Sequence, residues 1–264
     1  MSDVALEAEY LREAIEKDYL FLEYQPQVRG EGSTLASVEA LVRCRRPQHG
    51  VVPPVDFVQF AERNELIEQL GAWVLRHACR DGARWPGLRV AVNVSPRQFR
   101  SQDFVGFVES TARAEGMAFD RLELEITESA YFDDPDRAEQ ELRSLRALGI
   151  RVALDDFGTG YASLSYLRRL PLDKIKIDKS FIDALDTADG AAIVKAVLGL
   201  ARALRLDVTA EGVETIAQRD FLVAAGCDYL QGHLFSPAVS ADEISALLAT
   251  RSSDDTILLS PRPG

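Results

Sequence analysis

Short runs of apolar and β-branched residues alternate with helical segments over most of this 264-residue chain, and this alternation restricts the possible folds more than any other feature. The runs with strand character are LRVAVNV (88–94), LELEIT (122–127), IRVALDD (150–156), KIKID (174–178), LDVTAEG (206–212) and CDYLQG (227–232). Helical segments such as 134–149 and 190–205 separate most of them, and 54–84 is predicted to form two helices. Such alternation is typical of a parallel sheet covered by helices.

The first part of the chain breaks this alternation. Residues 20–28 and 35–43 both have strand character, and only a short turn-rich stretch joins them. We expect an antiparallel hairpin, because a parallel crossover needs about a dozen residues or more. The total of about eight strands, in a length close to the roughly 250 residues of an α/β barrel, predicts a (β/α)8-type barrel whose first hairpin is irregular. An open doubly wound sheet is the structural alternative.

Composition and termini set the expected surroundings of this barrel. We expect one domain over 20–250, a helical linker over 1–19 and a flexible tail over 251–264. The formal net charge of −12 disfavours binding to DNA or RNA. The chain has no apolar run near the roughly 18 residues that span a membrane, and its charged start carries no signal-peptide core. With three scattered cysteines, these features predict a cytoplasmic location.

Acid, amide and lysine side chains stand near the C-terminal ends of the predicted strands, the end that forms the active site in parallel barrels. These residues are Glu39, Asn93, Glu125, Asp155, Asp156, Lys176, Glu211 and Gln231. A single charged residue at a strand end is commonly only solvated. The repetition of an acid, an amide or a lysine from strand to strand indicates a functional site instead.

The residue types in this set indicate a particular chemistry. Five of them are carboxylates, whose repulsion in one barrel mouth requires neutralisation by cations. The candidate ligands offer only oxygen, which favours Mg²⁺ or Mn²⁺. The neighbours Asp155 and Asp156 suit two ions, since one acid can be shared while the other binds the second ion. Paired ions promote in-line displacement at phosphorus, and Lys176 can stabilise the developing charge.

The same residues lie in an ordered set of short motifs. They are EAL at 39–41, NVSPRQF from Asn93, EITE at 125–128, DDFGTG at 155–160, KIKIDKSF around Lys176, AEGVET around Glu211 and LQGHLFS around Gln231. In this order, over about residues 24–248, the chain resembles the EAL domain, the cyclic di-GMP phosphodiesterase module of bacterial signalling. The resemblance implies a modified TIM barrel with an antiparallel first strand. It also implies hydrolysis of cyclic di-GMP to linear pGpG with two Mg²⁺ or Mn²⁺ ions. Ca²⁺ is expected to be inhibitory, because its longer bonds and looser coordination spoil a two-ion site.

The resemblance further implies a role for each motif residue. The first metal ion is expected at Glu39, Asn93, Glu125 and Asp155, and the second at Asp155, Asp156 and Glu211. The expected catalytic set is Lys176, Glu211, Glu39 and Gln231, with Lys176 at the nucleophilic water. The expected substrate-binding positions are Gln25, Leu41, Arg43 and Asp178. The loop and supporting positions are Glu128, Phe157, Gly158, Thr159, Gly160 and Glu214.

Simpler interpretations stay open for some of these residues. Arg43 is either a partner of a substrate phosphate or a surface arginine, and Asp178 is equally an N-cap for the next helix. Glu128 either anchors the DDFGTG loop or caps a helix, and Glu214 either supports the site or opens a helix. The loop over 157–163 is either a switch that moves Asp156 or a plain connector.

Three functions fit the whole sequence. The first is an active cyclic di-GMP phosphodiesterase, which the intact set of predicted ligands favours. The second is an EAL domain that binds the nucleotide without cutting it, and the third is an unrelated barrel enzyme that uses Mg²⁺ on a phosphorylated sugar. The resemblance also implies a homodimer formed near the DDFGTG loop, and an N-terminal sensor or GGDEF domain in a longer parent protein.

Overall fold

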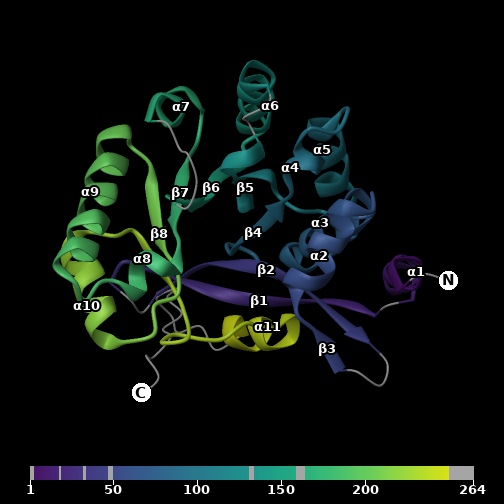
Figure 1. The fold of residues 1–264 in the computed structure, drawn as a ribbon, viewed down its shortest axis with the longest axis horizontal. Coiled ribbons are helices and arrows are strands. Elements are labelled where there is room, and N and C mark those ends of the chain that lie inside the picture. The colour runs from purple at the N-terminus through teal and green to yellow at the C-terminus, as the bar shows by residue number, and fades with distance from the viewer. Residues whose placement is uncertain are drawn as a thin grey trace.

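Eight strands close into a barrel in the computed structural model, which describes residues 3–17, 19–31, 34–46, 50–130, 134–158 and 164–249 (Figure 1). The barrel strands are β1 (Leu20–Arg29), β2 (Leu35–Arg46), β4 (Arg89–Val94), β5 (Leu122–Thr127), β6 (Arg151–Phe157), β7 (Lys174–Ile177), β8 (Asp207–Ala210) and β9 (Tyr229–Gln231). Strand β1 pairs with both β2 and β9, so the sheet has no opening. The closed barrel is confirmed, and the open doubly wound sheet is excluded.

Strand β1 runs against the direction of its neighbours. It is antiparallel to β2 and to β9, whereas each pair from β2–β4 through β8–β9 is parallel. Its register sets Gln25 opposite Glu39 and Gln27 opposite Ser37. On the other side, Gln27 lies opposite Gln231. The predicted antiparallel first strand is therefore confirmed.

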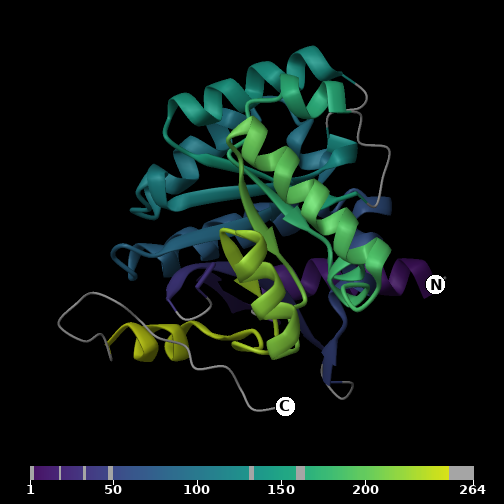
Figure 2. The same ribbon diagram turned by 90° about the vertical axis from the view of Figure 1, so that its left-hand side faces the viewer.

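Helices form an outer layer around these strands (Figure 1). The helices are α1 (Asp3–Glu16), α2 (Pro54–Arg63), α3 (Ile67–Ala83), α4 (Pro96–Phe99), α5 (Phe104–Ala114), α6 (Pro135–Ala147), α7 (Leu164–Arg169), α8 (Lys179–Asp183), α9 (Ala188–Leu204), α10 (Ile216–Ala225) and α11 (Ala241–Ala249). Figure 2 faces α9, which packs against β8, and α11 packs across β1. Two short additional strands, β3 (Gly50–Val52) and β10 (Val239–Ser240), pair with β2 and β1 outside the barrel order.

Alternation along the barrel strands separates the apolar core from the interior polar groups. In β5, Leu122, Leu124 and Ile126 are buried in the hydrophobic core cluster. Glu123 and Glu125 alternate with them and are equally buried. Since successive side chains of a strand point to opposite faces, the two glutamates face the barrel axis while the apolar residues pack under the helices.

The structure leaves some sequence predictions untested. The tail over 251–264 and the loop residues Thr159 and Gly160 lie outside the described residues. The helix expected in the first segment is observed as α1, while the division at residue 19 into linker and domain stays a prediction. Among the described residues, none of the helices combines the length and the apolar character needed to cross a bilayer.

Candidate functional site

A buried lysine lies at the centre of the predicted acids, at the C-terminal end of the barrel. Lys176 projects from β7, and its side chain is 1% exposed. Its Nζ lies 2.6 Å from Glu125, 2.7 Å from Glu211, 3.1 Å from Asp155 and 3.4 Å from Glu39. These side chains are far apart in the sequence. They come together here from the barrel strands β2, β5, β6 and β7, and Glu211 follows directly on β8. We refer to Glu39, Glu125, Asp155, Asp156, Lys176 and Glu211 as the acid cluster.

Amide side chains donate to both carboxylate oxygens of Glu39. Asn93 Nδ2 donates a hydrogen bond of 2.6 Å to Glu39 Oε1, and Gln231 Nε2 donates one of 2.7 Å to Glu39 Oε2. Gln231 Nε2 also donates to Gln25 Oε1 at 3.0 Å. Asn93 and Gln231 therefore each donate to one oxygen of Glu39, and Gln25 is linked to it through Gln231. Because the amide nitrogen of Asn93 is used on Glu39, its carbonyl oxygen is the atom left for a metal ion.

The neighbouring acids Asp155 and Asp156 reach the same region through an irregularity in β6. The pairing of β6 with β7 shifts between Leu154 and Phe157, and Asp156 has a φ of 54°. Aspartate tolerates this left-handed conformation better than most residues, and such bulges redirect side chains at the ends of strands. Ligand oxygens of Asp155, Asp156 and Glu211 consequently lie within 4.8 Å of one another, a spacing that a single metal ion can bridge.

The cluster carries more negative charge than Lys176 neutralises. Burial, together with repulsion by Glu39, raises the pKa of Glu125 well above its usual range. Burial and repulsion by Asp155 also raise the pKa of Glu211, and attraction to Lys176 lowers it only in part, so it reaches about 8. For Glu39, burial is outweighed by Lys176 and the two amide donors, so its pKa is lowered. Contacts with Asp155 and Glu125 outweigh burial at Lys176 and raise its pKa well above its usual range.

These properties fit divalent cations. Glu125 Oε1 is buried and has no hydrogen-bond partner among the described residues, so it offers a free lone pair in a charged site. Carboxylate and amide oxygens are the ligands that Mg²⁺ and Mn²⁺ prefer. Positive charge added here would relieve the repulsion that raises the carboxyl pKa values. The acid cluster is therefore suited to hold divalent ions.

A cavity of about 550 Å³ adjoins the cluster between β2, β4, α2 and α3. Asn93, Leu41 and Arg43 are among its lining residues, so Asn93 lies at the border between cavity and cluster. Arg43 Nε donates to Glu23 Oε2 at 2.8 Å, and its side chain is 18% exposed. The half-buried position does not fit a simple surface arginine. The ion pair with Glu23 orients the guanidinium at the edge of the cavity.

The remaining predicted residues lie around this centre. Asp178 is the N-cap of α8, where its Oδ1 accepts from the Ser180 backbone N–H at 3.0 Å. The capping role is therefore observed, while its role toward the substrate stays a prediction. Glu128 is buried in the 3-10 turn that follows β5. Glu214 forms an exposed ion pair with Lys179, and Thr215 rather than Glu214 is the N-cap of α10.

The loop that follows Asp156 begins in a constrained conformation. Phe157 is buried at the end of β6. Gly158 has a φ of 96°, and a Cβ there would approach Phe181 Cζ to 2.8 Å. Gly158 is therefore required both for its left-handed backbone and for the ring of Phe181 that covers it.

A second buried polar layer lies deeper in the barrel, and sequence reasoning missed it. Lys174 Nζ lies 2.6 Å from Glu123 Oε1, and both side chains are fully buried. Lys174 Nζ also contacts Gln27 Oε1 at 3.5 Å, and Ser37 Oγ donates to the same oxygen at 2.6 Å. The signal was present in the period of two of LELEIT and KIKI, which places both glutamates and both lysines on the inner face.

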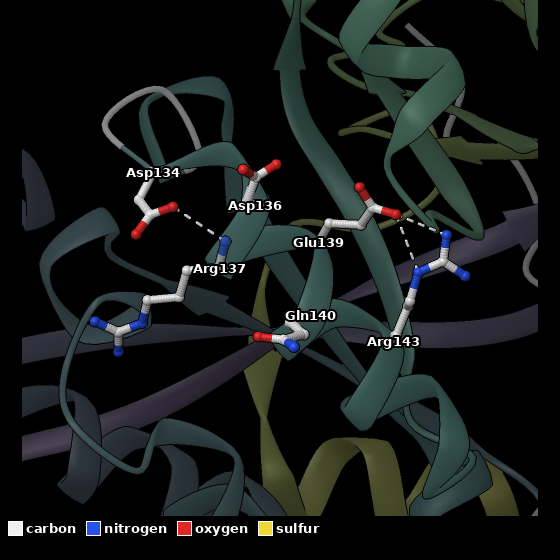
Figure 3. A pocket seen from close by; sticks show the side chains of 6 residues that line it. All are labelled: Asp134, Asp136, Arg137, Glu139, Gln140 and Arg143. Atoms are coloured by element: carbon white, nitrogen blue, oxygen red, sulfur yellow. Dashed lines mark hydrogen bonds and ion pairs between the residues drawn. The ribbon is translucent and has the colours of Figure 1, made fainter.

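A surface hollow of about 380 Å³ on α6 has different properties (Figure 3). Its charged groups already have partners: Asp134 accepts from the Arg137 backbone N–H at 3.1 Å, and Arg143 pairs with Glu139 at 2.7 Å. Arg137 pairs with Glu141 at 2.9 Å, and Asp136 pairs with Arg169. None of its lining residues belongs to the acid cluster or to the cavity beside it. These contacts are those of a capped helix with a solvated face, and they carry no sign of a binding site.

Comparison with known proteins places this geometry in context. The family model described as EAL domain matches residues 8–238. An uncharacterized signaling protein of Caulobacter vibrioides is 48% identical over 237 residues, which are 89% of this chain and 29% of that protein. The cyclic di-GMP phosphodiesterase NbdA of Pseudomonas aeruginosa is 44% identical over 234 residues, covering 86% of this chain and 30% of NbdA.

A solved structure has the same fold. The PaMucR phosphodiesterase in complex with c-di-GMP superposes with a TM-score of 0.87 at 41% identity, covering 90% of this chain and 99% of that one. The chain thus spans less than a third of the length of the curated relatives named above, and nearly all of this solved domain.

Proposed function

Because this chain belongs to the EAL domain family, we propose that it is a metal-dependent phosphodiesterase that hydrolyses cyclic di-GMP to linear pGpG. The observation that carries the proposal is the buried Lys176 within 3.4 Å of four carboxylates. This arrangement stands at the barrel end where (β/α)8 enzymes have their active sites, next to a cavity of substrate size. The names of NbdA and PaMucR agree with the proposed activity.

The proposal assigns the acid cluster to two divalent ions, Mg²⁺ or Mn²⁺. Glu39, Asn93, Glu125 and Asp155 would hold the first, and Asp155, Asp156 and Glu211 the second. When bound, such ions supply an activated water and stabilise the charge on the phosphodiester. The unpaired Glu125 Oε1 and the close set of Asp155, Asp156 and Glu211 support this assignment.

The residues of the chain would divide the remaining work between catalysis and binding. As an ammonium paired with the carboxylates around it, Lys176 would stabilise negative charge at the attacking oxygen and would not act as a base. Glu39 and Glu211 hold that ammonium in place, and Gln231 orients Glu39 through its amide. Gln25, Leu41 and Arg43 would hold the substrate, with Asp178 at the edge of the site. In hydrolysis, the water oxygen bonds to phosphorus, one P–O ester bond breaks, and the departing oxygen takes a proton.

The direct test is turnover by the purified chain. Cyclic di-GMP is incubated with the protein in Mg²⁺, Mn²⁺, Ca²⁺ or EDTA, and the products are separated by chromatography. We expect pGpG with Mg²⁺ and Mn²⁺. With Ca²⁺ we expect binding without turnover, because Ca²⁺ takes longer bonds and looser coordination. Binding of cyclic di-GMP without pGpG in any metal would refute the enzyme and support a binding module. The family match removes the third interpretation, an unrelated enzyme of phosphorylated sugars.

We further propose a setting for this domain. The curated relatives are about three times longer than the matched region, which supports further domains in the parent protein. We place a sensor or GGDEF domain on the N-terminal side. A homodimer formed near the loop after Asp156 and a cytoplasmic location complete the proposal. Size-exclusion chromatography with light scattering tests the dimer.

A further inference from the structure

Gln27 is a fully buried polar residue that the proposed mechanism does not use. It lies on β1, which runs between β2 and β9. The register sets Gln27 directly opposite Ser37 on β2 and Gln231 on β9. Ser37 is two residues before Glu39 on β2, so the Gln27 side chain lies one layer below the acid cluster. It is next to the deeper charged pair of Lys174 and Glu123.

The hydrogen bonds around Gln27 fix the orientation of its amide. Its Oε1 accepts from Ser37 Oγ at 2.6 Å and lies 3.5 Å from Lys174 Nζ. A lysine ammonium can only donate, so the oxygen end of the Gln27 amide must face it. The nitrogen end then points to β9, where Nε2 donates to Gln231 Oε1 at 2.9 Å.

The hydrogen bond from Gln27 also fixes the orientation of the Gln231 amide. With Oε1 occupied by Gln27, Gln231 directs its two N–H groups to Glu39 Oε2 at 2.7 Å and Gln25 Oε1 at 3.0 Å. Both acceptors need a donor, and an ionised Glu39 can only accept. A flipped Gln231 would place its carbonyl oxygen against Glu39 Oε2 and remove one of the donors to a buried carboxylate, which is costly even though Asn93 and Lys176 remain.

We propose that Gln27 is a positioning residue that orients the Gln231 amide and, through it, the Glu39 carboxylate for metal binding. The inference rests on the proposed function for the role of Glu39. Among the described residues, the hydrogen bonds of the Gln27 side chain go to Gln231, Ser37 and Lys174 and not to the acid cluster, so its route to Glu39 is through Gln231. Partners that orient metal ligands from outside the coordination shell typically contribute about 10-fold to 100-fold in metal affinity or activity.

The test uses Gln27→Met, which keeps the size of the side chain and removes its polar atoms. Mn²⁺ binding is measured by titration calorimetry without substrate, and kcat and KM are measured with cyclic di-GMP. We expect Mn²⁺ affinity and kcat to fall by about 10-fold each, with KM changed less than about 3-fold. Gln140→Met on the exposed face of α6 is the matched control and should change neither quantity. Circular dichroism confirms that the variants are folded.

A double-mutant cycle separates positioning from simple support of the core. In a Gln231→Met background, Gln27→Met should cost less than about 2-fold, because the amide through which it acts is gone. Equal losses in both backgrounds would overturn the proposal and make Gln27 a structural residue only. Wild-type Mn²⁺ affinity in Gln27→Met would overturn it as well.

Two further measurements keep the result interpretable. If Gln27→Met does not fold, Gln27→Glu replaces it, since Ser37 and Lys174 can still donate to the new carboxylate while the donor to Gln231 is lost. Wild-type Mn²⁺ affinity and kcat in Gln27→Glu would overturn the proposal. If the wild-type chain binds Mn²⁺ but releases no pGpG, the proposed function fails, and the calorimetric comparison still decides the role of Gln27.

Discussion

Replacing Lys176 by methionine tests whether one buried ammonium stabilises the acid cluster and its chemistry. Methionine keeps most of the volume of the lysine stem, so the change removes charge with little change in packing. The lysine lies within 3.4 Å of four carboxylates and its side chain is 1% exposed. Without divalent ions, the substitution removes the cation that these four acids share, so their mutual repulsion is no longer offset.

The size of the effect follows from burial and protonation. Removing one partner of a buried ion pair costs about 3–5 kcal/mol. Proton uptake by Glu125 and Glu211, whose pKa values burial already raises, relieves part of this cost. We therefore expect the free energy of unfolding to fall by about 2–4 kcal/mol at pH 8 in EDTA. In a barrel of this length, this lowers the Tm by about 5–15 °C. Mg²⁺ should restore most of it by binding the freed carboxylates.

Catalysis should suffer more than binding. The ammonium faces charge that develops at the attacking oxygen, so its loss should lower kcat by about 10²-fold or more, while the Kd for cyclic di-GMP measured in Ca²⁺ changes only a few-fold. Scanning calorimetry in EDTA and in Mg²⁺, with chromatographic assay of pGpG, measures both effects. Lys195→Met, on the exposed face of α9, is the control. An unchanged Tm in EDTA together with an unchanged kcat would refute the electrostatic reasoning.

Three further predictions follow from the same site. Glu39→Gln should abolish metal-dependent turnover while the Tm in EDTA stays within about 5 °C of wild type, because one charge is lost without loss of volume; pGpG production near the wild-type rate would exclude Glu39 as a ligand. In EDTA the pKa of Glu211 is about 8, above the ordinary carboxyl value of the unfolded chain. The folded state therefore holds a proton that the unfolded state has lost between about pH 5 and pH 8, so stability should fall as pH rises through that window; a higher Tm at pH 8 than at pH 6 would contradict this. Gly158→Val should weaken Mg²⁺ activation about 10-fold, because φ is 96° and the new side chain meets Phe181 next to the aspartates. Gly116→Val, which has a φ of 74° and no heavy atom within 4 Å of its Cβ, should destabilise the chain without changing Mg²⁺ activation; equal effects of the two valines on activation would show that the loop is only a connector.

The barrel could be predicted because its strands, most of them four residues or longer, recur in regular alternation with helices. Strand β5 has the predicted bounds, since LELEIT alternates over its whole length. Strands β3 and β10 were not predicted, because runs of three and two residues carry no periodicity and depend on the neighbours with which they pair. The sequence could show that β1 and β2 form a hairpin, but only the closed pairing of β1 with β9 excludes an open sheet.

The acid cluster could be predicted from residue type at strand ends, whereas its orientation could not. Nothing in the residue pair Asp155–Asp156 indicates a φ of 54° at the second aspartate. The ion pair of Arg43 with Glu23 joins residues on adjacent strands and needs their register. Gln27 was missed because an inward-facing glutamine below the strand ends is not by itself typical of a functional site. Its proposed role depends on its hydrogen bond to the Gln231 amide, which only the structure shows.

The reversed direction of β1 has a consequence for how this domain can be joined to others. In an all-parallel barrel the first strand enters from the floor, opposite the catalytic rim. Here the start of β1 pairs with the far end of β2, with Leu20 opposite Cys44, so the chain enters at the rim. Helix α1 accordingly lies beside that rim, where the Tyr10 hydroxyl donates to the Arg45 carbonyl at 2.9 Å. The segment that leads into β1 is therefore joined to the barrel on the side of the acid cluster, next to α2, and not on the opposite side of the barrel.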